Sequence, residues 1–164
     1  MSNNANLPKT KLHSGLNGMA HPRCLAIDVA TIIAVSHPPG KTQIQKKGYL
    51  HTPIVENACL TCRQLNTIFG SRNVFIFGRV GENIEERYRH WLQFHRIITD
   101  SLCDPKNLFF SQDIDALLNY FVEHHISDIV SCRNDLLELC YYKISGKRLL
   151  FTNWGDIEKQ LLVP

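Results

Sequence analysis

Apolar residues along this chain fall into two alternating patterns, short continuous runs and longer stretches with helical spacing. Short apolar runs are typical of strands buried on both faces of a parallel sheet. They predict strands at residues 25–35, 73–78, 107–110, 126–130 and 148–152. The helical spacing predicts helices at residues 53–69, 82–95, 113–124, 134–139 and 156–162. Strands and helices that alternate in this order predict an α/β protein, a three-layer α/β/α Rossmann-like fold around a parallel sheet.

Two of these elements carry clear boundary signals. Thr52 is a good N-cap residue, and Pro53 after it suits the first position of a helix that Gly70 then stops. The first strand contains one acid, Asp28, and Ala30 with Thr31 interrupts the apolar run just beyond it. A break in the strand after Asp28 is therefore a second way to interpret that run.

The first 22 residues lack either pattern, contain no acid, and are rich in Asn, Gly and Pro. They predict a flexible N-terminal tail at residues 1–22, followed by one domain at residues 23–164. A chain of 164 residues is long enough for one domain with a core of its own. An organelle-targeting segment is the other interpretation of the tail, although such segments are richer in Arg and Ser.

The composition, 44% hydrophobic and 20% charged residues, is that of a folded globular domain. A net charge of +3 is too small to predict a nucleic-acid surface, and the basic segment at residues 41–47 is best explained as a loop. No apolar stretch is long enough to predict a membrane span. Six cysteines in a chain without an export signal favour reduced thiols, and we therefore expect a cytoplasmic protein. Cys59 and Cys62 lie on the apolar face of a predicted helix, which indicates core residues rather than a redox or zinc site.

Ligands of doubly wound α/β proteins bind in the crevice outside the carboxyl ends of the strands. The residues to consider there are Asp28, which would close the first strand at the break, Arg79 after the second strand and Arg133 after the fourth. An aspartate that closes a strand often accepts backbone N–H groups of the next turn. From the residues alone, a structural role is the better interpretation of Asp28, since one acid does not make a catalytic site.

Five segments, taken in chain order, form a pattern that can be compared with known families. They are DVATIIA from Asp28, the helical stretch at residues 49–70, NVFIFGRVG from Asn73, HHISDIVSCR from His124 and FTNWGDIEKQLL from Phe151. In order and character they resemble the small capless phosphatase-like members of the haloacid dehalogenase-like hydrolase superfamily. In that family the first strand ends in D-x-D-G-[VT]-[IL]-A. The resemblance spans residues 24–162. It implies a Rossmann-like fold in which Asp28 stands at the position of the nucleophile that attacks phosphorus, with Mg²⁺ as cofactor.

The other working positions of that family are changed in this chain. Ala30 stands where the resemblance places the general acid, Gly78 where it places a phosphate-binding Ser or Thr, and Asp115 where it places a Lys. Ser131 and Cys132 take the places of the metal-binding acids. Loss of general acid–base assistance alone typically costs ~10²–10⁴ in rate. We therefore expect a catalytically inactive pseudo-phosphatase that acts as an interaction or structural module with an unidentified protein partner, and that needs no cofactor.

Three further expectations follow. Arg79 and Arg133 are predicted to retain a phosphate or other anion site, because guanidinium groups suit phosphate oxygens. The alternative function is a divergent Mg²⁺-dependent phosphohydrolase in which Asp28 attacks and Asp128 or Asp135 binds the metal. A second alternative is a subunit of a larger assembly that binds its partner through residues 41–47 and the tail.

Overall fold

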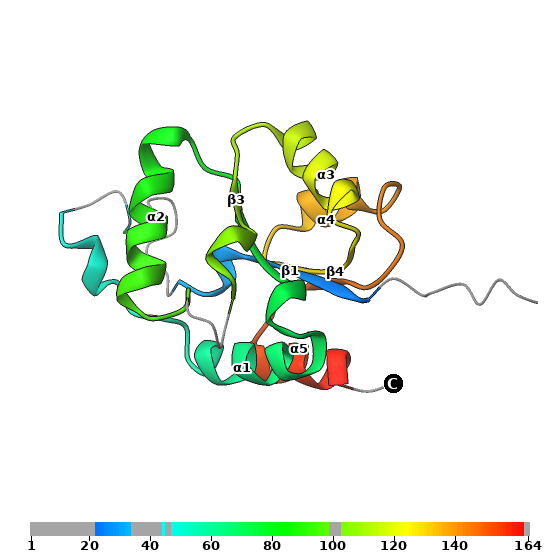
Figure 1. Cartoon of the computed structure of the whole chain (residues 1–164), viewed down its shortest axis with the longest axis horizontal. Helices are drawn as coiled ribbons and strands as arrows, with labels where there is room; N and C mark the ends of the chain where they lie inside the picture. Colours follow the sequence, from blue (N-terminus) through cyan, green and yellow to red (C-terminus); the bar gives the residue numbers. More distant parts are fainter. Residues whose placement is uncertain (1–21, 34–43, 45–46, 99–102, 163–164) are drawn as a thin grey trace, which may run out of the picture.

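The computed structural model describes residues 22–33, 44, 47–98 and 103–162 (Figure 1). Five parallel strands form one sheet in the order β3-β2-β1-β4-β5. Their bounds are β1 (Cys24–Asp28), β2 (Val74–Gly78), β3 (Leu108–Phe110), β4 (Ile126–Ser131) and β5 (Arg148–Leu150). The predicted tail and the basic segment at 41–47 lie outside the described residues, except for Pro22, Ile44 and Lys47.

Helices cover both faces of the sheet, as Figure 1 shows for α1 and α5 on one side and α3 and α4 on the other. Among the described residues, the α-helices are α1 (Ala58–Phe69), α2 (Glu82–Phe94), α3 (Ile114–Glu123), α4 (Asn134–Cys140) and α5 (Trp154–Leu162). In the described part of the chain, none of them has the length and apolar content needed to cross a bilayer. The predicted three-layer, Rossmann-like α/β architecture is confirmed.

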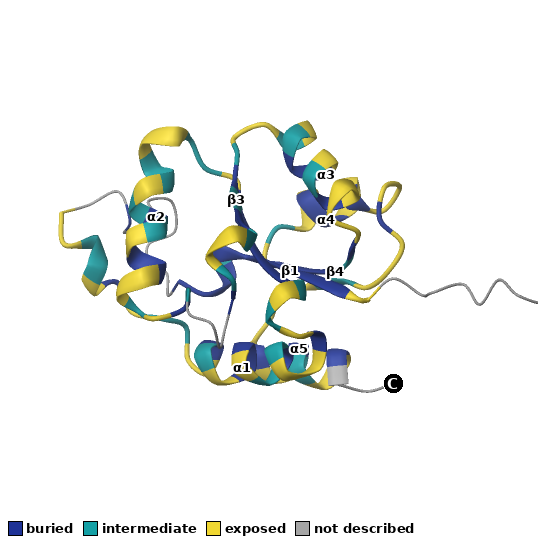
Figure 2. Cartoon of the chain, viewed as in Figure 1, coloured by how far each residue is buried: buried dark blue, intermediate teal, exposed yellow. Residues whose placement is uncertain are grey.

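Side chains on the two faces of the central strands pack into two separate apolar cores. Leu25 and Ile27 of β1 pack with the buried side chains of α1, α2 and α5, whereas Ala26 between them packs with those of α3 and α4. All five residues of β1 are buried, and Figure 2 shows the central strands in the colour of buried residues. This double burial explains why the strands are continuous apolar runs rather than alternating patterns.

The first strand is shorter than the predicted span of residues 25–35. It ends at Asp28, and a 3₁₀ turn, η1 (Val29–Thr31), follows. The Asp28 side chain accepts the backbone N–H of Ala30 at 3.0 Å, and the Thr31 hydroxyl donates to the Asp28 carbonyl at 2.6 Å. Two polar side chains thus close a turn in a segment whose apolar content favoured a strand, and the break after Asp28 is confirmed.

The predicted start of the first helix at Thr52 is wrong, because α1 begins at Ala58. Residues 52–55 instead run beside the turn that follows β1. Ile54 forms an isolated antiparallel bridge with Ile33, and the Val55 N–H donates to the Ile32 carbonyl at 2.8 Å. Tertiary pairing has overridden a local capping signal here, and Gly70 does end the helix as predicted.

The last helix begins at Trp154, two residues before the predicted start, and the Trp154 side chain is buried. The indole N–H of Trp154 donates to the carbonyl of Thr31 at 3.2 Å. The Asn153 side chain accepts the N–H of Asp156 at 2.9 Å, which satisfies a backbone donor of the first turn. Helix α5 therefore packs against the turn η1, which contains Ala30.

Candidate functional site

The sheet has a topological switch point between β1 and β4, because the chain leaves β1 towards β2 and leaves β4 towards β5. A cavity of about 1160 Å³ opens at this edge of the sheet. Its walls come from the segments that follow β1, β2, β3 and β4 and from the first turns of α2: Asp28 to Ala30, Arg79 to Glu85, Tyr88, Phe110 to Asp113, and Arg133. The three residues singled out in the sequence, Asp28, Arg79 and Arg133, all line this cavity.

Asp28 is almost completely buried, with 2% of its surface exposed, and both of its carboxylate oxygens are engaged. Oδ1 accepts the backbone N–H of Ala30 at 3.0 Å, and Oδ2 accepts the hydroxyl of Ser131 at 2.7 Å. Burial raises the pKa of the Asp28 carboxyl, and these two hydrogen bonds oppose the rise. Asp28 therefore closes its own turn and ties the end of β1 to the end of β4.

Ser131 extends this tie to one of the arginines. Its Oγ, which donates to Asp28, also accepts the backbone N–H of Arg133 at 3.1 Å. This series of hydrogen bonds, from the Ala30 N–H through Asp28 to Ser131, thus fixes the position of the Arg133 backbone. The family resemblance assigns Ser131 only as a lost metal-binding acid, and the sequence pattern holds no signal for its contact with Asp28, which depends on β4 lying beside β1.

Arg79 and Arg133 lie near the same carboxylate. Nη1 of Arg79 is 3.9 Å, and Nη2 of Arg133 is 3.7 Å, from Oδ2 of Asp135 in the first turn of α4. The Arg79 side chain is also oriented by its Nε, which donates to the Gln112 carbonyl at 3.3 Å. The structure therefore brings two guanidinium groups from different loops to one place beside the cavity. This arrangement can bind an anion.

The position where the resemblance places a Ser or Thr has no room for a side chain. A Cβ on Gly78 would lie 2.8 Å from the ring of Phe110 and 2.9 Å from Cγ1 of Val29. Real Cβ contacts are longer than this, so the packing of Phe110 and Val29 has filled the space that a phosphate-binding hydroxyl would need. The packing around the end of β2 therefore excludes a phosphate-binding hydroxyl at the position of Gly78.

Gly78→Ser is expected to lower the free energy of unfolding by at least about 1 kcal/mol, because overpacking a filled site forces its neighbours to shift. Urea unfolding of the variant and the wild type measures this difference. Gly155→Ala is the matched control. A Cβ there would meet the Asn153 side chain at 3.4 Å, and the residue is exposed in a helix, where Ala is favoured over Gly. Equal stability of Gly78→Ser and the wild type would mean that the site is open.

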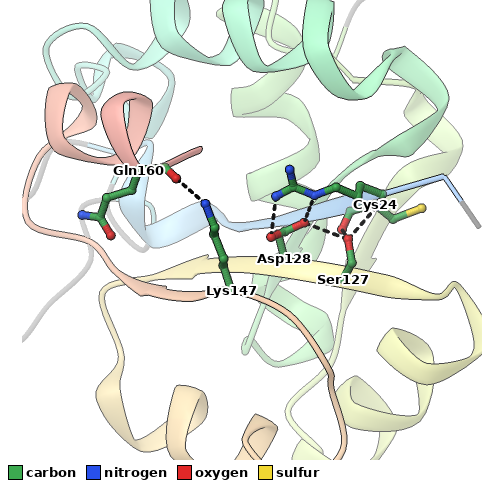
Figure 3. A network of polar contacts seen from close by, with 6 residues as sticks. Cys24, Ser127, Asp128, Lys147 and Gln160 are labelled. Atoms are coloured by element: carbon green, nitrogen blue, oxygen red, sulfur yellow. Dashed lines mark hydrogen bonds and ion pairs between the residues drawn. The ribbon is translucent and has the colours of Figure 1, made fainter. Parts of the chain in front are cut away.

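Asp128 belongs to a network of polar contacts near the start of β4 (Figure 3), away from the strand end where the metal-dependent alternative needs it. It pairs in register with Leu25, three positions before Asp28 on the neighbouring strand. Arg23 binds it with two hydrogen bonds, from Nε to Oδ2 at 3.1 Å and from Nη2 to Oδ1 at 2.8 Å. The Ser127 hydroxyl also donates to Oδ2 at 2.8 Å. The placement of Asp128 as a metal ligand shared with Asp28 is therefore wrong.

The other candidate metal ligands show no site either. Over residues 22–33, 44, 47–98 and 103–162, no group of three or more His, Cys, Asp or Glu side chains is arranged to hold a metal ion. Asp135 lies beside two arginines, which would disfavour a cation there. Cys62 is buried, as predicted for a core residue, and Cys59 is half-buried; burial raises the pKa of both thiols.

Asp28→Asn is expected to change how stability depends on pH. Because burial raises the pKa of Asp28 above its ordinary value of 3.8, the folded chain keeps this proton to a higher pH than the unfolded chain. The folded state binds more protons in that interval, so this residue makes the free energy of unfolding fall as pH rises.

Asp28→Asn lacks this pH-dependent loss of stability. As pH rises, its free energy of unfolding should therefore increase relative to that of the wild type, by about 1.4 kcal/mol in total per unit of pKa shift. Urea unfolding of both proteins between about pH 4 and pH 8 measures the gain. Parallel curves would mean that Asp28 ionises alike in the folded and unfolded chain.

No model of a protein family matches the chain, and no curated protein matches its sequence. The geometry at the carboxyl ends of the strands is therefore the basis for a functional conclusion.

Proposed function

We propose that the chain is a catalytically inactive, haloacid dehalogenase-like domain that acts as an interaction module and binds a phosphomonoester group through Arg79 and Arg133. The observation that carries the proposal concerns Asp28 and the two arginines. Both carboxylate oxygens of Asp28 accept hydrogen bonds from within the protein, whereas the guanidinium groups of Arg79 and Arg133 lie close to each other beside the cavity. The phosphomonoester is carried by a small molecule or by a side chain of a partner protein.

The inactivity follows from what a phosphatase of this kind requires. Its nucleophile must be ionised and must reach phosphorus, whereas Asp28 is 2% exposed and burial raises its pKa. Ala30 has no proton to give to a leaving group, and such assistance is typically worth ~10²–10⁴ in rate. Gly78 offers no hydroxyl and no space for one. The loss of a positioned stabilising group typically costs another ~10²–10³.

The binding half of the proposal rests on the two arginines and the cavity. Guanidinium groups form strong, charge-assisted hydrogen bonds to phosphate oxygens. The cavity of about 1160 Å³ is slightly larger than typical small-molecule sites of about 300–1,000 Å³. Tyr88 and Phe110 contribute apolar wall next to the polar end. A ligand with a phosphate head and a larger body suits these walls.

Calorimetric titration of phenyl phosphate into the wild type, Arg79→Ala and Arg133→Ala tests the proposal. Each substitution is expected to weaken binding by about tenfold or more, since hydrogen bonds to charged groups contribute about 1.5–3 kcal/mol. Arg63→Ala, which removes an exposed arginine of α1 that does not line the cavity, should bind like the wild type. A phosphoserine peptide and its unphosphorylated form, titrated in parallel, separate a protein-borne phosphate from a small molecule.

Two results would overturn the proposal. One is binding of phenyl phosphate that is the same in the wild type and both arginine variants. The other is Mg²⁺-dependent hydrolysis of p-nitrophenyl phosphate that Asp28→Asn abolishes, because that would restore the catalytic alternative.

A further inference from the structure

Asp135 stands in the place that a bound anion would take. Its Oδ2 is 3.9 Å from Nη1 of Arg79 and 3.7 Å from Nη2 of Arg133. Both distances exceed ordinary N–H···O hydrogen-bond lengths of about 2.7–3.2 Å. The Asp135 side chain is 63% exposed, so it is held loosely by charge and has space to move away. One oxygen shared between two guanidinium groups marks where an incoming oxyanion would sit.

We infer that Asp135 is a built-in competing anion, which occupies the subsite of Arg79 and Arg133 until a ligand displaces it and which lowers the affinity of that subsite for anionic ligands. This inference rests on the proposed function, because it assigns a regulatory element to the same site. Every anion that binds there must first displace Asp135, so the cost is the same for each. The two arginines themselves favour a dianionic phosphate over a monoanionic carboxylate, because the second charge strengthens the attraction.

Contacts that do not involve Asp135 hold the Arg79 side chain and the backbone of Arg133. Arg79 donates through Nε to the carbonyl of Gln112. The backbone of Arg133 is tied to Ser131, and Ser131 to Asp28. Asp135 itself is an exposed side chain, so its displacement leaves these contacts in place.

Glu85 and Asp113 line the cavity, and both are engaged elsewhere. Glu85 pairs with Arg89 at 2.7 Å on its own helix, and Oδ1 of Asp113 accepts the Asp115 N–H at 2.9 Å to cap α3. Asp135 is the carboxylate that both Arg79 and Arg133 share. Removing its charge should therefore change the anion subsite more than removing the charge of Glu85 or Asp113.

Asp135→Asn tests the inference, with phenyl phosphate, sulfate and acetate as probes in calorimetric titrations at about pH 7.5, where a phosphomonoester is a dianion. The wild type should bind phenyl phosphate and sulfate more tightly than acetate. The variant should bind phenyl phosphate about fivefold more tightly, the effect expected of exposed ion pairs worth up to about 1 kcal/mol. Sulfate and acetate affinities should rise by a similar factor in the variant, because each of these anions has to displace Asp135 in the wild type.

Glu138→Gln is the matched control, since it removes one exposed carboxylate from the same helix, where Glu138 accepts from Asn134 rather than from an arginine. Its affinities should stay within about twofold of the wild type. Asp135→Ser serves as a second variant, and thermal unfolding of each protein establishes that it is folded. Unchanged or weaker phenyl phosphate binding in both folded variants, with the arginine variants still defective, overturns the inference and leaves the proposed function standing. Binding that the arginine variants do not affect overturns the proposed function itself.

Discussion

Arg23→Ala is expected to lower the free energy of unfolding by about 2–4 kcal/mol, among the largest effects of a single substitution in this chain. The reason is that Asp128 is 2% exposed inside β4 and would lose both hydrogen bonds from the guanidinium group. Breaking a fully buried pair typically costs 3–5 kcal/mol. Because the Arg23 side chain is 50% exposed, water can partly replace it, and we expect a smaller loss.

Equilibrium unfolding in urea measures this loss, and the double variant Arg23→Ala/Asp128→Asn identifies its cause. If the cost comes from an unpaired carboxylate in the sheet, removing that charge should recover part of the stability. Arg63→Ala, at an exposed position on α1, should stay within about 0.5 kcal/mol of the wild type. A loss below about 0.5 kcal/mol for Arg23→Ala would show that Asp128 is adequately solvated without its partner.

Two substitutions of Asp28 are expected to behave differently. Asp28→Ala removes the acceptor for the Ala30 N–H and for the Ser131 hydroxyl. A buried group left without a partner costs about 1–3 kcal/mol, so the variant should lose about 2–4 kcal/mol for the two groups together. Asp28→Asn keeps an oxygen for Ala30 and places an amide beside Ser131, whose Oγ can accept it. It should retain most of the stability at neutral pH.

The same pair of variants also reports on binding. Since Ser131 positions the backbone of Arg133, Asp28→Ala should weaken phenyl phosphate binding, whereas Asp28→Asn should keep it within about threefold of the wild type. Urea unfolding and calorimetric titration of both variants provide the two measurements. Equal losses of stability in both variants would contradict the structural role, because the amide would then be unable to replace the carboxyl in the tie.

Much of the fold could be predicted from the sequence because hydrophobic burial dominates it. Strands such as β2, buried on both faces, must be continuous apolar runs, and α2 shows its buried side as Tyr88, Trp91 and Leu92 at helical spacing. The prediction was wrong where polar contacts or distant partners decide. The hydrogen bonds of Asp28 and Thr31 end β1 early, and the pairing of Ile54 with Ile33 overrides the capping signal at Thr52.

The candidate site was predictable only to the extent that it depends on strand ends. Asp28 ends a strand, and Arg79 and Arg133 each follow one; parallel strands bring such residues to one edge of the sheet. The partners of these residues were not predictable. Ser131 meets Asp28 because β4 lies beside β1, an order that the sequence pattern does not contain. Asp135 had been considered as a metal ligand, and only the positions of two side chains from separate loops reveal its place between them.

Asp28 holds the site together rather than acting as a nucleophile in it. To test this role, the wild type and Asp28→Asn are compared for hydrolysis of p-nitrophenyl phosphate and for binding of phenyl phosphate, with and without Mg²⁺. We expect no hydrolysis by either protein and similar, Mg²⁺-independent binding by both. Mg²⁺-dependent hydrolysis by the wild type that is absent in Asp28→Asn would contradict this role.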